Sequence, residues 1–403
     1  MHERDEIEAQ PGLTGARSPQ PIHPRLGIIG GGQLAKMTAL AGLSLGCDVV
    51  VLERNSYSPA ATLATHSIVG DWDNPEALFE LAHRVDVVTL ENEFVDARAL
   101  GALEEAGFPV FPGAACLARV QDKLEQKRVL AAAGLAVPAF VPAADPEAVR
   151  EAGRQFGWPL LLKARRDAYD GKGNVTVTAP AGVDEAWSRL GGDRGRALYV
   201  EAFCPFQAEL AVMVTRGRTG ESVVYPVVET VQENHVCHLV KVPAGVPAAT
   251  AAQAARLAEA AVSVVGGVGT FGVEMFLTAG GEVLINELAP RVHNSGHYTI
   301  EACACSQFEN HVRAVLGWPL GSPRLRAPAA VMINLLGRSK APARPVGMAE
   351  ALAVPGAHVH LYGKAMSSAG RKLGHVTALG ETLKAAQATA TRAARALRFG
   401  ESP

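Results

Sequence analysis

The chain has 403 residues, of which 48% are hydrophobic and 19% charged, and its formal net charge at pH 7 is −2. This length predicts about two or three domains, and the apolar fraction is too high for a disordered chain. Nucleic-acid-binding proteins usually carry a basic excess, which is absent here. The sequence also contains no run of about 18 strongly apolar residues, so no membrane-spanning helix is expected.

Residues 1–24 are polar and rich in Pro and Gly, and we expect them to form a flexible leader. They lack the apolar segment of a signal peptide. The six cysteines include no Cys-x-x-Cys pair, and a chain of this length does not need disulfides. Reduced thiols and a cytoplasmic location are therefore expected.

Residues 25–117 alternate short apolar segments with helical ones. The expected strands cover residues 26–29, 48–53, 67–69, 85–90 and 109–111, and the first helix covers 33–45. Strands and helices alternating at this spacing predict a parallel sheet covered by helices.

A glycine-rich turn, Gly30-x-Gly32-x-x-Ala35, joins the first strand to the first helix, and Glu53 ends the next strand. Glycines let the backbone approach a phosphate at a helix N-terminus, and an acid at this distance can accept a ribose hydroxyl. The turn alone leaves three interpretations open: binding of NAD, binding of another phosphate, or a tight turn without a ligand.

Residues 118–325 are expected to combine antiparallel strands with helices. Helices are predicted at 121–133 and 248–265, and strands at 159–163, 175–178, 198–203, 209–215, 222–228, 272–277 and 282–288. The last two strands flank Gly280-Gly281 and predict a hairpin. Residues 326–403 predict a smaller third domain, with strands at 330–336 and 358–362 and a helix at 383–397.

A second glycine-rich segment, Tyr169-Asp-Gly-Lys-Gly-Asn174, lies between two expected strands. It is not a Walker loop, because no Gly-Lys-Ser/Thr leads into a helix. Its backbone N–H groups and Lys172 suit it to fold over phosphates. Lys163 ends an apolar strand nearby, and a buried ammonium group needs an anion. Together with Lys123 these cations indicate a triphosphate site.

Two carboxylates, Glu274 and Glu287, lie on adjacent strands of the predicted hairpin, beside Asn286. Their oxygens suit Mg²⁺, which commonly shares carboxylates with substrate phosphates. The alternative is that both acids form ion pairs with lysines. Glu201 and Glu209 are similarly open to two interpretations, as an adenine and ribose site or as salt-bridged surface groups.

These motifs, in this order, resemble the ATP-grasp superfamily. The run from Asn286 to His297, Asn-Glu-Leu-Ala-Pro-Arg-Val-His-Asn-Ser-Gly-His, is similar to that of the N5-carboxyaminoimidazole ribonucleotide synthetases, as are Glu91-Asn-Glu93 and residues 370–375. The resemblance implies an α/β and α+β fold of three domains. These are a Rossmann-like pre-ATP-grasp domain (25–117), an ATP-grasp domain (118–325) and a small C-terminal mixed α/β domain (326–403).

The resemblance also implies a function: ATP- and bicarbonate-dependent carboxylation of aminoimidazole ribonucleotide through carboxyphosphate, in purine biosynthesis, by a homodimer. The ATP contacts that it implies are Lys123, Lys163, Ala168, Tyr169, Asp170, Gly171, Lys172, Gly173, Asn174, Glu201, Ala202, Phe203, Cys204, Glu209, Gln232, Asn286 and Glu287. The family usually has a histidine where this chain has Gln232, and His235 lies near enough to compensate.

The remaining implied roles concern the metal, the bicarbonate and the ribonucleotide. Glu274 and Glu287 match the ligands of Mg²⁺, with Mn²⁺ as an alternative ion. Arg291, helped by Tyr169 and Lys364, matches the residue that holds bicarbonate or carboxyphosphate. The implied ribonucleotide contacts are Gly32, Gln33, Leu34, Glu91, Asn294, Ser295, His297, Lys364, Arg371 and Lys372, and His375 is a further candidate. The first glycine turn is thereby assigned to substrate phosphate instead of NAD.

Three other functions are weighed against this one. A different ATP-grasp ligase, such as a formyl-phosphate-dependent glycinamide ribonucleotide transformylase, does not match the Asn-Ser-Gly-His run. An NAD-dependent oxidoreductase leaves residues 169–174 and the Glu274–Glu287 pair unexplained. A catalytically inactive nucleotide-binding module does not explain why Lys163, both acids and Arg291 are retained.

Overall fold

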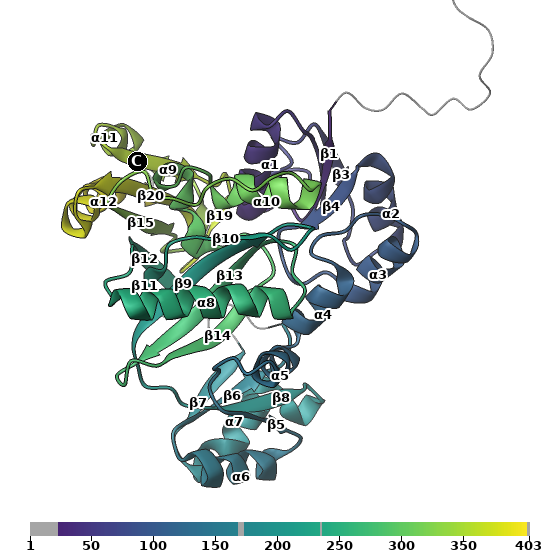
Figure 1. The fold of residues 1–403 in the computed structure, drawn as a ribbon, viewed down its shortest axis with the longest axis vertical. Helices are drawn as coiled ribbons and strands as arrows, with labels where there is room; N and C mark the ends of the chain where they lie inside the picture. The colour runs from purple at the N-terminus through teal and green to yellow at the C-terminus, as the bar shows by residue number, and fades with distance from the viewer. Residues whose placement is uncertain (1–22, 168–172, 234–235, 401–403) are drawn as a thin grey trace, which may run out of the picture.

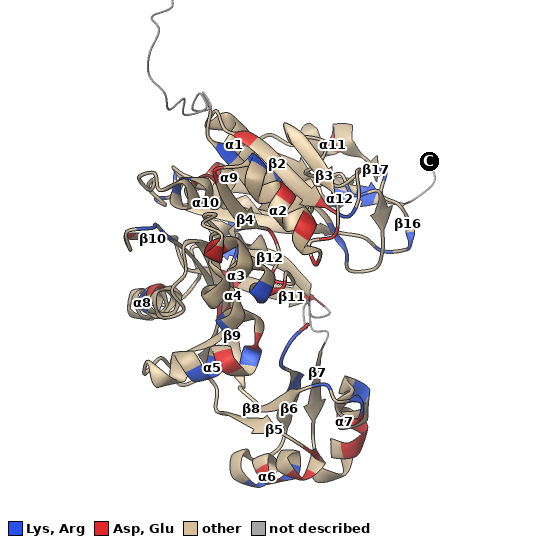
Figure 2. Ribbon diagram, turned by 90° about the vertical axis from the view of Figure 1, so that its right-hand side faces the viewer, with Lys and Arg blue, Asp and Glu red and all other residues tan. Residues whose placement is uncertain are grey.

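The structure is a computed structural model that describes residues 23–167, 173–233 and 236–400 (Figure 1). Basic and acidic residues are interspersed along helices such as α5 (Lys123–Ala132), α6 (Pro146–Phe156) and α7 (Val183–Leu190), as Figure 2 shows. None of the helices in the described ranges has the length and apolar character needed to cross a membrane. All six cysteines lie in these ranges, and none forms a disulfide, as expected.

The first part of the chain forms a four-stranded parallel sheet of order β3-β2-β1-β4, which confirms the predicted architecture. The strands are β1 Arg25–Ile29, β2 Asp48–Glu53, β3 His66–Val69 and β4 Val87–Leu90. The helices are α1 Gln33–Ser44, α2 Pro75–Arg84, α3 Ala97–Glu105 and α4 Ala114–Gln121. The strand predicted at 109–111 is reduced to a single bridge between Val88 and Val110.

The helix predicted over 121–133 begins two residues later, because Asp122 separates α4 from α5. The Asp122 carboxylate accepts the backbone N–H groups of Leu124 and Glu125, each at 3.2 Å. It also accepts two hydrogen bonds from Arg165, at 3.0 and 2.6 Å. Asp is a favoured N-cap residue, so it starts a new helix where the amphipathic pattern alone runs on.

A second, antiparallel sheet of order β5-β8-β6-β7 lies at one end of the molecule, with α6 and α7 beside it (Figure 1). Its strands are β5 Phe140–Ala143, β6 Leu160–Ala164, β7 Asn174–Val177 and β8 Leu198–Ala202. Short 3-10 helices, η1 Pro180–Gly182 and η2 Gly192–Arg194, flank α7. The sheet carries Lys163 and Glu201 on neighbouring strands.

The largest sheet has nine strands, eight of them in the order β14-β13-β9-β11-β12-β15-β20-β18, while β10 pairs with β9. Their bounds are β9 Phe206–Arg216, β10 Ser222–Val224, β11 Val228–Glu233, β12 Val236–Val242, β13 Gly269–Thr278, β14 Val283–Ala289, β15 Ala329–Leu336, β18 Ala357–Leu361 and β20 Lys372–Gly380. The predicted strand 222–228 is thus two strands, and β12 and β20 are additional. Because β12 pairs with β15, one sheet crosses the predicted boundary at 325/326.

Helices cover this sheet on both sides. The remaining helices are α8 Ala248–Val264, η3 Asn294–Gly296, α9 Thr299–Ala302, α10 Gln307–Leu316, α11 Met348–Leu352 and α12 Leu383–Ala396. Short strand pairs complete the C-terminal part: β16 Ala341–Pro342 with β19 Met366–Ser367, and β17 Pro345–Val346 with β21 Arg398–Phe399. Alanines of α8 pack on β9 and β13, and alanines of α12 pack on β15 and β20.

The Asp122 cap gives a first test of this arrangement. Asp122→Ala removes the cap of α5 and the partner of Arg165, so we expect a loss of about 2–3 kcal/mol and a Tm lowered by about 5 °C. Asp122→Asn retains the capping oxygen and is expected to lose about half as much, as measured by thermal unfolding followed by circular dichroism. Equal losses in the two variants would contradict the separate contribution of the cap.

Candidate active site

The first glycine turn is held by two carboxylates of the protein. The N–H of Gly31 donates to Glu53 at 2.6 Å, and the N–H of Gly32 donates to Glu91 at 2.7 Å. The other oxygen of Glu91 accepts the N–H of Ala35 at 3.0 Å, at the first turn of α1. These N–H groups therefore contact acids of the protein, so a ribonucleotide phosphate bound at Gly32, which stays a prediction, would have to replace Glu91 there. Burial raises the pKa of Glu91, against the lowering effect of these hydrogen bonds.

The neighbouring residues Gln33 and Leu34, which are also predicted to contact the ribonucleotide, differ in how deeply they are buried. Gln33 is the first residue of α1 and is half-buried. Leu34 is 7% exposed and packs with Met37, Phe308 and Tyr362. The Leu34 side chain belongs to the apolar interior between α1 and the C-terminal part, and its contact with the ribonucleotide stays a prediction.

Glu93, which follows β4, forms a bidentate ion pair with Arg291. Arg291 Nε and Nη2 donate to the two Glu93 oxygens at 2.5 and 3.1 Å. Burial alone raises the pKa of Glu93, but Arg291 and Lys123 outweigh it and lower that pKa to about 2. Sequence reasoning recorded the Glu91-Asn-Glu93 motif without giving Glu93 a role. Its position just after a parallel strand, where ligands commonly bind, was the available signal.

Glu201 lies between two lysines, of which Lys127 is buried and Lys163 is half-buried. Lys163 Nζ is 2.6 Å from one of its oxygens, and Lys127 Nζ is 3.2 Å from the other. Tyr199 also donates its hydroxyl to Glu201 at 3.0 Å. Desolvation opposes ionisation, but the two lysines outweigh it and lower the pKa of Glu201 to about 2. Burial in turn lowers the pKa of Lys127 to about 8.

This arrangement refines the predicted adenine site. The Glu201 carboxylate is enclosed by Lys127, Lys163 and Tyr199, so the predicted adenine contact at this residue would fall to its backbone. Ala202, Phe203 and Cys204 follow at the end of β8, and Phe203 is 45% exposed. Glu209 lies on β9, in register with Phe276 of β13. Sequence reasoning missed the role of Lys127.

Glu274 and Glu287 are directly opposite each other on β13 and β14. The ladder shifts between Glu274 and Met275, which leaves Asn286 as a bulged residue, and bulges redirect side chains. Lys123 Nζ lies 3.2 Å from Glu287, and His293 Nε2 lies 3.4 Å from Glu274. Burial, Glu287 and Glu209 together raise the pKa of Glu274 to about 8.

This strained pair of carboxylates fits a divalent cation. A cation between the two acids would offset both their repulsion and the desolvation of Glu274. No group of three or more His, Cys, Asp or Glu side chains arranged for a metal occurs within the described ranges. Mg²⁺ nevertheless commonly uses one or two carboxylates and completes its shell with phosphate oxygens and water, so two acids suffice.

The predicted ribonucleotide contacts 294, 295 and 297 lie in and beside η3 and are buried. Asn294, Ser295 and His297 are 8%, 1% and 0% exposed. The Asn294 amide exchanges two hydrogen bonds with Asn334, at 2.9 and 2.7 Å. The three side chains therefore contact the protein interior, where β15 and β20 of the C-terminal part meet η3.

The C-terminal candidates and Gln232 lie nearer the surface. Lys364 Nζ is 5.8 Å from the centre of the Tyr362 ring. Arg371 is exposed and donates to the carbonyl of Met366 at 3.1 Å, and Lys372 begins β20. Gln232 is exposed on β11, at the irregular end of its pairing with β12.

Only residues 173 and 174 of the predicted phosphate loop, 168–174, belong to the part of the chain that the structure describes. Ala168, Tyr169, Asp170, Gly171 and Lys172 lie outside the described residues, as does His235. Gly173 has a φ of +95° and accepts the N–H of Ala164 through its carbonyl at 2.8 Å, and Asn174 then begins β7.

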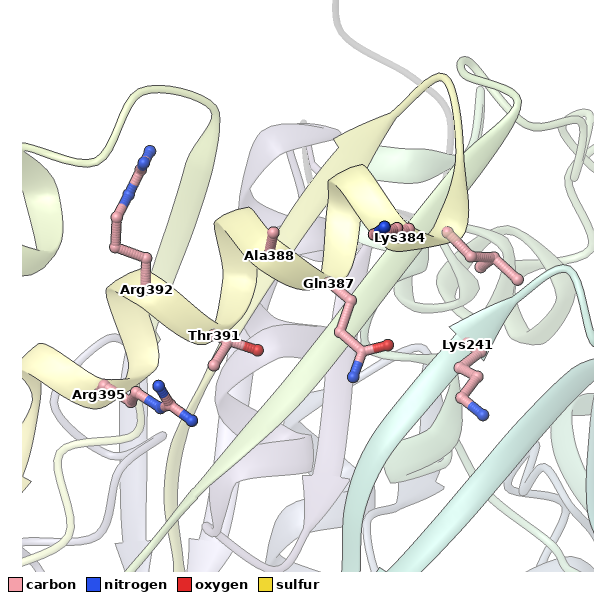
Figure 3. Close-up of a pocket in the computed structure, with 8 residues that line it drawn as sticks. Lys241, Lys384, Gln387, Ala388, Thr391, Arg392 and Arg395 are labelled. Atoms are coloured by element: carbon pink, nitrogen blue, oxygen red, sulfur yellow. The ribbon is translucent and has the colours of Figure 1, made fainter.

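A separate groove of about 840 Å³ lies between β12 and α12 (Figure 3). Lys241, Lys384, Arg392 and Arg395 line it together with Gln387 and Thr391. None of the residues that the sequence predicted for catalysis or binding lines this groove. The candidate site is therefore the charged region formed by β4, α5, β6, β8, β13 and β14.

Models of known protein families match three parts of the chain. An ATP-grasp domain matches residues 128–308, a ribonucleotide synthetase preATP-grasp domain matches 24–121, and a phosphoribosylaminoimidazole carboxylase C-terminal domain matches 330–389. The fold and the site thus define an ATP-grasp ligase.

Individual relatives show which family of ATP-grasp ligases is most similar to this chain. The N5-carboxyaminoimidazole ribonucleotide synthase of Synechococcus elongatus is 42% identical over 353 residues, which cover 87% of this chain and 88% of the relative. The phosphoribosylaminoimidazole carboxylase of Schizosaccharomyces pombe is also 42% identical, over 89% of this chain, but the chain spans only 65% of that relative's length.

Solved structures of proteins from the same family have a similar fold. The N5-carboxyaminoimidazole ribonucleotide synthetase of Thermotoga maritima has a TM-score of 0.84 and 38% identity, covering 94% of this chain and all of that one. The Aspergillus clavatus synthase in complex with ADP and 5-aminoimidazole ribonucleotide has a TM-score of 0.85 and 35% identity, over 93% and 98% of the two chains. The chain belongs to the N5-carboxyaminoimidazole ribonucleotide synthase family, and an NAD-dependent oxidoreductase is not supported.

The Lys127–Glu201–Lys163 cluster predicts a large effect of Glu201→Gln. Without the carboxylate, two buried ammonium groups face each other, so we expect a loss of about 3–5 kcal/mol and a Tm lowered by about 10 °C. Because the pKa of Glu201 falls from 4.5 to about 2 on folding, its contribution is present above pH 4.5 and is lost as the pH falls towards 2. Thermal melts over this range should show the two proteins converging in acid.

The matched control is Glu147→Gln, which breaks an ion pair with Arg154 on the surface. Exposed pairs contribute little, so the Tm is expected to change by no more than about 1 °C. A Glu201→Gln variant as stable as this control would contradict the described cluster.

Proposed function

We propose that the protein carboxylates aminoimidazole ribonucleotide, using ATP and bicarbonate, and releases N5-carboxyaminoimidazole ribonucleotide, ADP and phosphate. The observation that carries this proposal is the meeting of Glu274, Glu287 and Lys123 with the Glu93–Arg291 pair at one place. Relatives named for this reaction, and an Aspergillus clavatus complex with ADP and the ribonucleotide, support it.

In the first step a bicarbonate oxygen attacks the γ-phosphorus of ATP, and the bond from that phosphorus to ADP breaks. The protein's part is to hold the phosphates and neutralise their charge, with Lys123 and Lys163 as the ammonium groups. Ala202 to Cys204 would contact adenine through the backbone, and Glu209 the ribose. Residues 168–174 would cover the phosphates.

Glu274 and Glu287, with Asn286 beside them, would hold Mg²⁺, or Mn²⁺ in its place. The bound ion supplies charge neutralisation for the phosphate oxygens. Lys123 contacts Glu287 in the structure, so its ammonium group would bind either that carboxylate or a phosphate oxygen of ATP.

In the second step the amine of the ribonucleotide attacks the carboxyl carbon of carboxyphosphate, phosphate leaves with the C–O bond electrons, and the amine loses a proton. Arg291 would hold the planar bicarbonate and carboxyphosphate, because a guanidinium group offers parallel donors. Carboxyphosphate is unstable in water, so closure of the loop around Tyr169 would protect it.

The ribonucleotide would lie against Glu91, beside the first glycine turn, and against Lys364, Arg371 and Lys372 from the C-terminal part. We further propose that the enzyme is cytoplasmic and acts in purine biosynthesis. A homodimer that uses the first and third domains is proposed from the family resemblance, together with domain boundaries at 117/118 and 325/326.

The test is an assay of ADP release with and without bicarbonate and aminoimidazole ribonucleotide, combined with mass spectrometric detection of the carboxylated product. We expect release to depend on all three substrates. Glu287→Gln should lower Mg²⁺-dependent kcat by about 10²–10³-fold with the fold intact, because it removes one anionic ligand. ADP release that is indifferent to the ribonucleotide, without carboxylated product, would sink the proposal.

A second prediction concerns Arg291. Arg291→Lys keeps the positive charge but removes the two parallel N–H donors of the guanidinium group. The KM for bicarbonate should therefore rise by about tenfold or more, while the KM for ATP stays within about twofold. Steady-state kinetics with varied bicarbonate measure this effect. Arg313→Lys, at the Arg313–Glu309 pair on α10, is the control and should leave both constants unchanged. Unchanged bicarbonate kinetics in Arg291→Lys would exclude the proposed role.

A further inference from the structure

Tyr362 lies where the three parts of the chain meet. Its side chain is 1% exposed and packs with Leu34 and Met37 of α1. Its hydroxyl lies 3.1 Å from Nδ1 of His297 in the central part and 3.0 Å from Nδ1 of His375 on β20. One hydroxyl with one proton thus links two buried imidazole rings.

A series of hydrogen bonds that starts at a backbone carbonyl fixes the direction of these links. Asn334 donates its amide N–H to the carbonyl of Cys237 at 2.9 Å, and a carbonyl can only accept. The orientation of the Asn334 amide is therefore set, and its two bonds with Asn294 set the Asn294 amide in turn. As a result Asn294 presents its N–H₂ group to His297 Nδ1 at 3.3 Å.

The protonation of both rings follows. Because an amide nitrogen can only donate, His297 Nδ1 is an acceptor and its proton lies on Nε2. The Tyr362 hydroxyl must then donate to His297 and accept from His375, whose proton lies on Nδ1. Burial lowers the pKa of both histidines well below the ordinary value, so both rings are neutral and have a defined tautomer.

The two Nε2 atoms are buried and have no hydrogen-bond partner among the described residues. By the direction above, His297 Nε2 carries a hydrogen and needs an acceptor, while His375 Nε2 is itself an acceptor. A buried donor without a partner is costly, so a ligand or water is expected to supply the acceptor. His297 follows Arg291 by six residues, and Lys372 acts electrostatically on both His297 and Glu274. His297 and Lys372 are both residues predicted to contact the ribonucleotide.

We propose that Tyr362 is a positioning residue: Asn294 sets the Nε2–H tautomer of His297, and the Tyr362 hydroxyl orients the ring as a second donor to Nδ1, so that the Nε2–H group donates to an oxygen or ring nitrogen of the bound ribonucleotide. His375 donates a hydrogen bond to the Tyr362 hydroxyl, and the Cys237–Asn334–Asn294 series supplies the donor that fixes the His297 tautomer. The inference rests on the proposed function, because it takes the ribonucleotide as the ligand.

The first measurement is NMR of the full-length protein labelled with ¹⁵N-histidine, with the two rings assigned from His297→Gln and His375→Gln variants. We expect the Nε2–H tautomer for His297 and the Nδ1–H tautomer for His375. Aminoimidazole ribonucleotide should shift the His297 Nε2–H signal, and ATP alone should not. The same tautomer on both rings, or a His297 signal that ignores the ribonucleotide, overturns the proposal.

The second measurement is the kinetics of Tyr362→Phe, which keeps the ring and removes the hydroxyl. We expect the KM for the ribonucleotide to rise by about tenfold, the size of one lost buried hydrogen bond, with the KM for ATP within about twofold. Tyr225→Phe is the matched control, because Tyr225 is also buried and its hydroxyl bonds Cys305 and Asn310, away from this series. Equal kinetic effects in the two variants overturn the positioning role.

These outcomes remain separable from failure of the proposed function. If the wild-type protein forms no carboxylated product, the function fails whatever the tautomers are. If product forms but Tyr362→Phe retains the wild-type KM for the ribonucleotide, only the role of Tyr362 fails.

Discussion

The site depends on the exclusion of charged groups from water, which requires that every buried charge have a partner on another element. The Glu93–Arg291 pair shows this most clearly, because it joins the end of β4 in the first sheet to the segment after β14 in the largest sheet. A buried ion pair adds little net stability, but loss of one partner leaves an uncompensated charge and is strongly unfavourable. The pair therefore fixes how the two sheets meet more than it adds to the free energy of folding.

The same constraint explains why the C-terminal part shares a sheet with the centre of the molecule. Pairing of β12 with β15 brings Asn334 to the carbonyl of Cys237, and pairing of β18 with β20 brings Tyr362 to His375. A separately folded third domain, joined only by a linker, would not hold these side chains in register. The polar series between η3 and β20 is thus a consequence of sheet continuity.

Much of this arrangement could be predicted from sequence. Apolar alternation located the parallel sheet, and the spacing of Glu274 and Glu287 around a Gly-Gly turn located the opposed carboxylates, because both signals are local. The break of the helix at Asp122, the bulge at Asn286 and the burial of Leu34 depend on contacts with distant residues, so periodicity could not show them. The roles of Glu93 and Lys127 were missed for the same reason: a charged side chain in a motif does not show which partner it meets.

The contacts at the site also show what ligand binding must change. Lys123 is held by Glu287, Arg291 by Glu93, and the N–H of Gly32 by Glu91, so a protein carboxylate already binds each of these three groups, all of them suited to an anionic ligand. An incoming phosphate or bicarbonate must compete with these acids or share their partners. A cation bound by Glu287 would weaken the hold of that acid on Lys123 and free the ammonium group for phosphate. The carboxylates thus keep the cationic groups neutralised and positioned, at the cost of part of the affinity that bare cations would give.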